Sequence, residues 1–243
     1  SGQGHETLVS TVIGEVLEIE PDSIRVTRPK SHESLPGNSP VGSRMAIMLG
    51  GAAARAGEKL KAKIMAIAAH RLGVAIDQLR YEGGDVLAHD GRRFTWDEMV
   101  ELAHRQYHNL PDGMDPGLAS FDIMQVPTGD ALPVDDKVQM YPCYSFEFHL
   151  LLVSFDPIIG RPDIHSYVIG HDCGTVINPA IVSGMTYGGI AHGIGAALFE
   201  EFAYDTNGQL LTQSFLDYLM PSSHEVPAIQ IVKHCTPSPH TVF

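Results

Sequence analysis

Apolar residues recur at helical spacing in three stretches of the chain. The first stretch predicts a helix over residues 7–17, with an apolar stripe formed by Leu8, Val12, Ile13, Val16 and Leu17. A longer stripe predicts a second helix over residues 43–71, and the pair Gly50-Gly51 predicts a kink near its start. A third helix is predicted over residues 96–104, because Thr95 and Glu98 have the spacing of a capping box.

Alternating apolar and polar residues predict strands between and after these helices. Two short strands are expected within residues 79–94, and residues 146–155 and 164–169 predict a hairpin. Asn178-Pro179 breaks the chain and precedes a predicted helix over residues 180–199. Further strands are predicted at residues 23–26 and 228–233, and a second hairpin at residues 201–215.

These elements come in separate blocks, which indicates an α+β fold rather than a regular series of βαβ units. We expect two lobes of antiparallel strands with packed helices. The turn-rich stretch after the third helix marks the boundary between them. The lobes would span about residues 1–110 and 136–243, with a linker over about residues 111–135.

Composition and charge narrow the possible classes of protein. The chain has 243 residues and a net charge of −13, a balance that repels polyanions and excludes nucleic acid as an expected partner. Its three cysteines show no paired spacing, so we expect neither a disulfide framework nor a zinc site, and a reducing, cytoplasmic location. Residues 173–199 lack charged side chains but contain six glycines, which argues against a membrane span.

Three glycine-containing loops could bind an anion. Gly2-Gln3-Gly4 and Gly42-Ser43-Arg44 each lie directly before a predicted helix, where backbone N–H groups are exposed. Asp172–Thr175 forms a turn after a predicted strand and offers similar groups, although Asp172 could instead simply cap that turn. The first loop could equally lead into its helix without any ligand. Three such loops in an acidic chain suggest one large anionic ligand held mostly by backbone atoms.

Small residues line one face of the helix predicted after Asn178. Gly184, Gly188, Ala191 and Gly195 recur at helical spacing, so another backbone or a flat ligand could approach closely. Tight helix packing alone would explain the same pattern.

The sequence offers no other strong catalytic or metal motif. The histidine pair His165 and His171, and His5 with Glu6, could be metal ligands but are better explained as surface polar residues. Cys173 could be a nucleophile, but no activating base is evident. P-loop, Rossmann and GxSxG patterns are absent from the sequence.

Several motifs in order resemble one enzyme family. GQGHET, PGNSPVGSR, DCGTVINP with the glycine-rich helix, EEFAYDTNGQL, DYLMP and TPSPHT are similar to the large, molybdenum-binding subunit of the molybdenum hydroxylases. This family includes xanthine dehydrogenase, aldehyde oxidoreductase and aerobic carbon monoxide dehydrogenase. The segment LPDGMDPGL looks most like the carbon monoxide dehydrogenase branch, and the resemblance covers essentially the whole chain.

The resemblance implies a molybdopterin cofactor, in its cytosine dinucleotide form, and electron transfer to iron–sulfur and flavin (FAD) subunits. Gly2, Gln3 and Gly4 would contact the pterin and the molybdenum side, and Gly42 and Ser43 would lie under the metal centre. The turn after the strand and the start of the glycine-rich helix would hold the dinucleotide end. The implied cofactor-binding set is completed by His5, Arg44, Asp172, Cys173, Gly174, Thr175, Asn178 and Met185.

Two departures from the family pattern limit which functional residues of the family can be assigned to this chain. Met185 stands where the family usually has glutamine and cannot make the same amide hydrogen bonds. The family's catalytic glutamate lies in a GxKGxGE stretch that would follow Phe243, and the front half of the subunit is not represented. We therefore expect a segment of the cofactor-binding subunit of an oxidoreductase acting on a small molecule, inactive when isolated. It would derive from a longer subunit or, alternatively, a natural split subunit. The competing hypothesis is a non-catalytic cofactor-carrying or assembly module.

Overall fold

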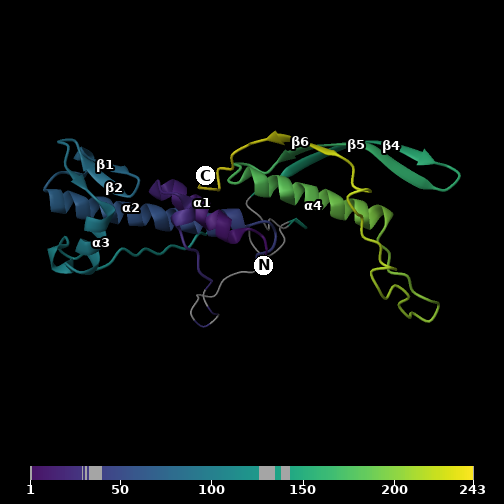
Figure 1. Ribbon diagram of the computed structural model, residues 1–243, viewed down its shortest axis with the longest axis horizontal. Helices are drawn as coiled ribbons and strands as arrows, with labels where there is room; N and C mark the ends of the chain where they lie inside the picture. The colour runs from purple at the N-terminus through teal and green to yellow at the C-terminus, as the bar shows by residue number, and fades with distance from the viewer. Residues whose placement is uncertain are drawn as a thin grey trace. The chain divides into compact units, whose positions relative to one another are not determined.

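The computed structural model describes residues 2–28, 30, 32, 40–125, 135–137 and 143–242 (Figure 1). The chain forms two compact units, one of residues 1–142 with 239–243 and one of residues 143–238. The described residues form helices together with two small sheets, which confirms the predicted α+β class.

Unit one begins with two packed helices. The helix α1 (His5–Leu17) lies against α2 (Gly51–Leu72), where a Cβ on Gly57 would come within 2.8 Å of a Val16 methyl carbon. The helix α2 follows a π-helical turn, η2 (Ala46–Gly50), so the long helix is irregular where its glycine pair predicted a kink. Because Gly57 has no side chain, the backbones of α1 and α2 can approach each other closely.

The remainder of unit one forms its core. A three-stranded antiparallel sheet of β1 (Leu79–Glu82), β2 (Asp85–Ala88) and β3 (Arg93–Phe94) is followed by α3 (Trp96–His104). The predicted capping box of α3 is confirmed. Short 3-10 turns complete the unit at η1 (Pro21–Ser23), η3 (Ile76–Gln78) and η4 (Tyr107–Asn109). Fully buried side chains from α2, β2 and α3 meet in the core: Ile64, Ile67, Val86 and Met99.

The strand predicted over residues 23–26 is wrong. Pro21 begins a 3-10 turn, in which the Ile24 amide donates to the Pro21 carbonyl at 3.1 Å. The residues after this turn are not paired in any strand of the part of the chain that the structure describes. The alternation of apolar and polar residues suggested a strand, but a β-strand forms only where its backbone pairs with a neighbouring strand.

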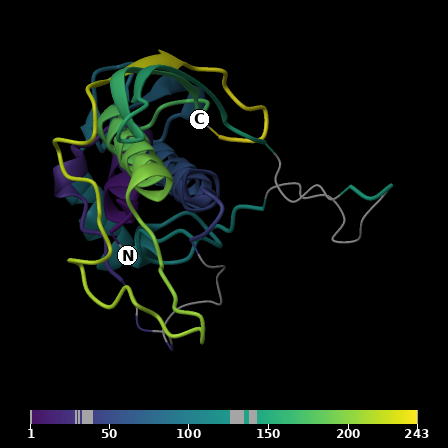
Figure 2. The same ribbon diagram turned by 90° about the vertical axis from the view of Figure 1, so that its right-hand side faces the viewer.

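Unit two is a three-stranded sheet with one long helix. Its strands are β4 (Phe146–Asp156), β5 (Arg161–Asp172) and β6 (Ile229–His234), and α4 (Pro179–Leu198) lies along one face (Figures 1 and 2). The strands β4 and β5 form the predicted antiparallel hairpin, whereas β6 pairs with β5 in parallel. Residue alternation in the sequence does not specify this parallel pairing. It arises because the connection through α4 returns the chain to the same end of the sheet.

The second predicted hairpin is only partly formed. A single bridge joins Tyr204 to Leu210, and the Asp205 carboxylate accepts the amides of Asn207 and Gln209 at 2.8 Å each.

The described helices include none with the length and apolar character that a bilayer crossing requires.

Candidate functional site

The loop before α1 leaves a helix N-terminus without a side-chain cap. Gly4 occupies the cap position in the left-handed region, with φ of 74°, and has no side chain to satisfy the first-turn N–H groups. Such an N-terminus carries a partial positive charge that favours an anion. His5 is half-buried at the first helical position, and the neighbouring Glu6 forms an ion pair with Arg28.

Gln3 brings the first and second predicted loops together. Its side-chain amide nitrogen donates to the carbonyl oxygen of Pro40 at 3.3 Å. Pro40 lies two residues before Gly42, so the Gly2–Gly4 loop lies beside the Gly42–Arg44 turn within unit one. Two loops that are almost forty residues apart in sequence therefore adjoin one another.

The second loop has an unusual backbone. Gly42 and Ser43 are consecutive left-handed residues, with φ of 70° and 51°. Glycine adopts this conformation freely, but a serine there is strained, and such strain is concentrated at functional sites. Arg44 follows, and its carbonyl accepts the Met48 amide at 2.8 Å as the π-helical turn begins. Residues 42–43 are exposed.

The third loop, in unit two, is shaped by Asp172. The carboxylate of this residue accepts the Gly174 amide at 3.0 Å, and the amide and hydroxyl of Thr236 at 3.1 and 2.5 Å. These hydrogen bonds from Thr236 and from the backbone lower the pKa of Asp172 to about 2. The alternative in which Asp172 caps the turn is therefore confirmed. Its carboxylate holds the loop in place.

The other residues of the third loop have separate roles. Asn178 caps α4, because its side-chain oxygen accepts the amides of Ala180 and Ile181 at 3.1 and 3.0 Å. Burial is the main cause that raises the pKa of the Cys173 thiol, which leaves less of it as the nucleophilic thiolate at neutral pH. Gly174 is left-handed with φ of 78°, and Thr175 is exposed beside it.

The small-residue face of α4 divides into two parts. Gly195 is buried and packed, since a Cβ there would meet Glu200 and the ring of Pro221. A Cβ on Gly184 or Gly188 would meet nothing within 4 Å. Helix packing thus explains the C-terminal glycine, whereas the N-terminal glycines border open space that another group could occupy. Met185 lies among them, with 64% of its surface exposed.

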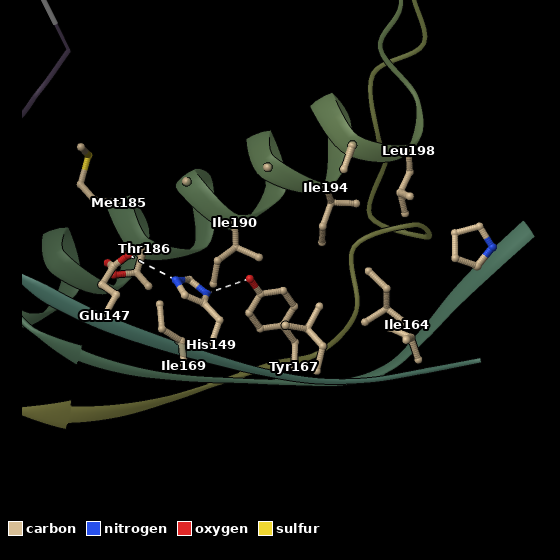
Figure 3. A pocket seen from close by; sticks show the side chains of 16 residues that line it. Glu147, His149, Ile164, Tyr167, Ile169, Met185, Thr186, Ile190, Ile194 and Leu198 are labelled. Carbon is tan, nitrogen blue, oxygen red and sulfur yellow. Dashed lines mark hydrogen bonds and ion pairs between the residues drawn. The ribbon is translucent and has the colours of Figure 1, made fainter. Parts of the chain in front are cut away.

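An apolar groove of about 590 Å³ runs between α4 and the sheet (Figure 3). Met185 and Ile190 line it from the helix, and Leu151 and Ile164 line it from the strands. This groove depends on how the sheet and the helix pack, so residue patterns in the sequence did not predict it.

A polar cluster lies at one end of the groove and was also missed. His149 Nδ1 lies 2.8 Å from the Tyr167 hydroxyl, and Glu147 contacts His149 Nε2 at 3.4 Å (Figure 3). Glu147 also contacts His171 Nδ1 at 2.6 Å. Burial, and then the charge of Glu147, raise the pKa of Tyr167. The signal was present in FEFHLLLV, where Glu147 and His149 share the parity of groove-facing Leu151.

The two histidines of β5, His165 and His171, contact different partners. His165 contacts the Ser154 hydroxyl at 2.7 Å, whereas His171 contacts Glu147, and the two histidines lie six positions apart along the strand, roughly 20 Å. No group of three or more potential metal ligands occurs among the described residues.

Comparison with known proteins shows similarity to molybdenum-containing enzymes. Residues 1–227 match the family model described as "Molybdopterin cofactor-binding domain". The chain is 33% identical over 239 residues to the nicotine 6-hydroxylase large subunit of Paenarthrobacter nicotinovorans. It is 31% identical to the carbon monoxide dehydrogenase large chain of Hydrogenophaga pseudoflava. Both alignments cover 98% of this chain, which spans only 28% of the length of either relative.

Solved structures show the same similarity. A crystal structure of the Cu,Mo-CO dehydrogenase matches 99% of this chain, and this chain covers 28% of that one, with a TM-score of 0.83 and 29% identity. The structure of quinoline 2-oxidoreductase from Pseudomonas putida 86 matches 99% of this chain, and this chain covers 29% of that one. The TM-score is 0.79 and the sequence identity is 30%.

Proposed function

The chain belongs to the molybdopterin cofactor-binding domain family of molybdenum hydroxylase large subunits, and we propose that it holds part of that cofactor in a molybdenum-dependent oxidoreductase. The single observation that supports this most is the pairing of the Gly2–Gly4 loop with the strained Gly42–Ser43 turn through Gln3. Both loops present backbone groups, and neither relies on a lysine.

The donor chemistry of these loops suits the proposed cofactor. A molybdopterin carries phosphate and polar ring edges, which backbone N–H groups at a helix start and in left-handed turns can bind. In this acidic chain, backbone donors would provide most of the positive potential, and Arg44 would be the one cationic side chain among these loop residues. Gly2, Gln3, Gly4 and His5 would bind the pterin and molybdenum side, with Gly42, Ser43 and Arg44 beside it.

Residues of unit two would hold the other end of the cofactor. We propose the cytosine dinucleotide form, bound by Cys173, Gly174 and Thr175 and by the start of α4 next to Met185. Asp172 and Asn178 would act by position, because their oxygens already accept hydrogen bonds from the turn and from the helix. The open surface at Gly184 and Gly188 would admit a flat group without steric conflict.

The chain's residues bind, orient and shield in this proposal. When bound, the molybdenum–molybdopterin group would supply oxygen transfer coupled to two-electron redox chemistry. The Gln3 amide fixes one loop against the other, and the capped start of α4 fixes the third loop. Preformed loops lower the entropic cost of holding the cofactor.

The wider assembly is also part of the proposal. The relatives named above are called large subunit and large chain, so we propose that iron–sulfur and flavin subunits accept electrons from this protein. We propose a small-molecule substrate, a cytoplasmic location, and two lobes joined by a linker over about residues 111–135.

Metal and nucleotide analysis of the intact protein tests the proposal. We expect about one molybdenum per chain by mass spectrometry of the metal, and a cytidine nucleotide after acid hydrolysis. Gly42→Ala should lower the molybdenum content several-fold. Gly91→Ala is the matched control, because Gly91 is also left-handed, with φ of 88°, in an exposed turn of unit one. Intact protein without molybdenum would contradict the proposal.

A further inference from the structure

Cys173 and Cys235 lie at adjoining ends of two paired strands. The parallel register of β5 and β6 ends at the pair Asp172 and His234, so the next residues in register are Cys173 and Cys235. Neighbouring strands lie about 4.8 Å apart, and a disulfide joins Cα atoms about 4.4–6.8 Å apart. The register therefore brings the two cysteines within the span of a disulfide.

Side-chain contacts hold these strand ends together. The Asp172 carboxylate accepts both the amide and the hydroxyl of Thr236, the residue after Cys235. The Cys235 thiol donates to the carbonyl oxygen of Gly174, the residue after Cys173, at 3.0 Å. Both cysteines are exposed, so a small reagent can reach either sulfur.

We propose that Cys173 and Cys235 are an oxidation site that forms a reversible intrachain disulfide with a small disulfide such as oxidised glutathione. One cysteine thiolate attacks the sulfur–sulfur bond of the oxidant, which gives a mixed disulfide and releases one thiol. The second cysteine thiolate attacks the protein sulfur of the mixed disulfide and releases the second thiol. The two protein thiols lose two hydrogens in total, and the oxidant becomes two thiols.

The resting state of the pair is the dithiol. Partial burial is the largest cause that raises the pKa of the Cys173 thiol, and the nearby charges of Asp172, Cys235 and Glu147 raise it further. The reactive thiolate of Cys173 is therefore scarce at neutral pH and becomes more abundant as the pH rises. The disulfide should form faster at mildly alkaline pH, and a reducing compartment keeps the pair open.

The disulfide would restrain a loop of the proposed cofactor site. It would fix residues 173–178 against the end of β6, and would remove the thiol that donates to Gly174. This consequence rests on the proposed function, in which that loop holds the dinucleotide end. Oxidation should then slow entry of the cofactor.

Peptide mapping of the intact protein tests the oxidation site. After treatment with oxidised glutathione at mildly alkaline pH, we expect a peptide that crosslinks Cys173 to Cys235 and disappears on reduction. Cys143→Ser should leave this crosslink unchanged, whereas Cys235→Ser should abolish it. Absence of the crosslink from the oxidised protein, or a crosslink through Cys143 instead, would overturn the proposal.

Cofactor uptake tests the consequence separately. Apo-protein in its oxidised form should take up molybdopterin several-fold more slowly, with full recovery after reduction and no effect in Cys235→Ser. Equal uptake by crosslinked and reduced protein would refute the regulatory part. If neither form bound molybdopterin, the proposed function would fail, whereas the peptide map would still decide the oxidation site.

Discussion

Asp172 shows how one residue can define a loop. Its carboxylate accepts three hydrogen bonds from the turn and from Thr236, which links the end of β5 to the segment after β6. The sequence suggested a choice between phosphate binding and turn capping at this residue. The Gly174 amide shows that Asp172 caps the turn, and Thr236, sixty-four residues away, adds a long-range link that the sequence does not reveal.

Acid should weaken this link in a defined window. The folded pKa of Asp172 is about 2, below its ordinary value of 3.8, so the unfolded state binds more protons as the pH falls. The stabilisation is present above about pH 4 and is lost as the pH falls through about 2. Urea unfolding of wild type and Asp172→Ala should differ most above pH 4 and converge toward pH 2. A difference that did not change with pH would contradict this cause.

Met185 stands where the family resemblance implies a glutamine. Because its side chain is 64% exposed, Met185→Gln should change the free energy of unfolding by less than about 0.5 kcal/mol. An added amide would give the cofactor a donor and an acceptor, so molybdenum should be retained longer during dialysis. Tyr187→Gln, two positions along α4, is the control and should not change retention. Faster loss from Met185→Gln would argue against contact with the cofactor.

At the scale of elements, the sequence predicted features that depend on neighbouring residues, but it did not predict pairing between distant segments. The capping box of α3 depends on Thr95 and Glu98 alone, so the sequence predicted it correctly. The β4–β5 hairpin was also predicted, because its strands are adjacent in sequence. The parallel β6, the groove and the cluster of Glu147, His149 and Tyr167 depend on the register between distant segments, which alternation cannot specify.

Two helix caps provide a matched test of the site. Asn178→Ala in α4 and Thr95→Ala in α3 each remove an N-cap and should each cost about 1 kcal/mol of stability. Asn178 also fixes the third loop, so only its variant should lose molybdenum as well. Denaturant unfolding and metal analysis of both variants would measure the two effects. Equal molybdenum loss in both variants would show that stability alone controls retention.

At the scale of the whole molecule, the proposed cofactor loops are divided between two units, and much apolar surface is exposed. Every described residue of β4 before Asp156 is exposed, including Phe146, Phe148, Leu150 and Leu152 at 59–74%. A surface of this kind is typical of an interface rather than of an isolated unit. The chain also spans only 28% of the length of the relatives it matches.

We therefore expect the 243-residue polypeptide, when produced alone, to turn over neither an aldehyde nor an N-heterocycle, whereas the larger assembly proposed above should turn over a small-molecule substrate. Dye-linked electron transfer measures turnover, and metal analysis of the same samples reports whether the cofactor is bound. Molybdenum in an intact complex that shows no activity toward any substrate class would favour the cofactor-carrying alternative. Turnover by the polypeptide alone would refute the prediction, because one part of the site would then suffice for the reaction.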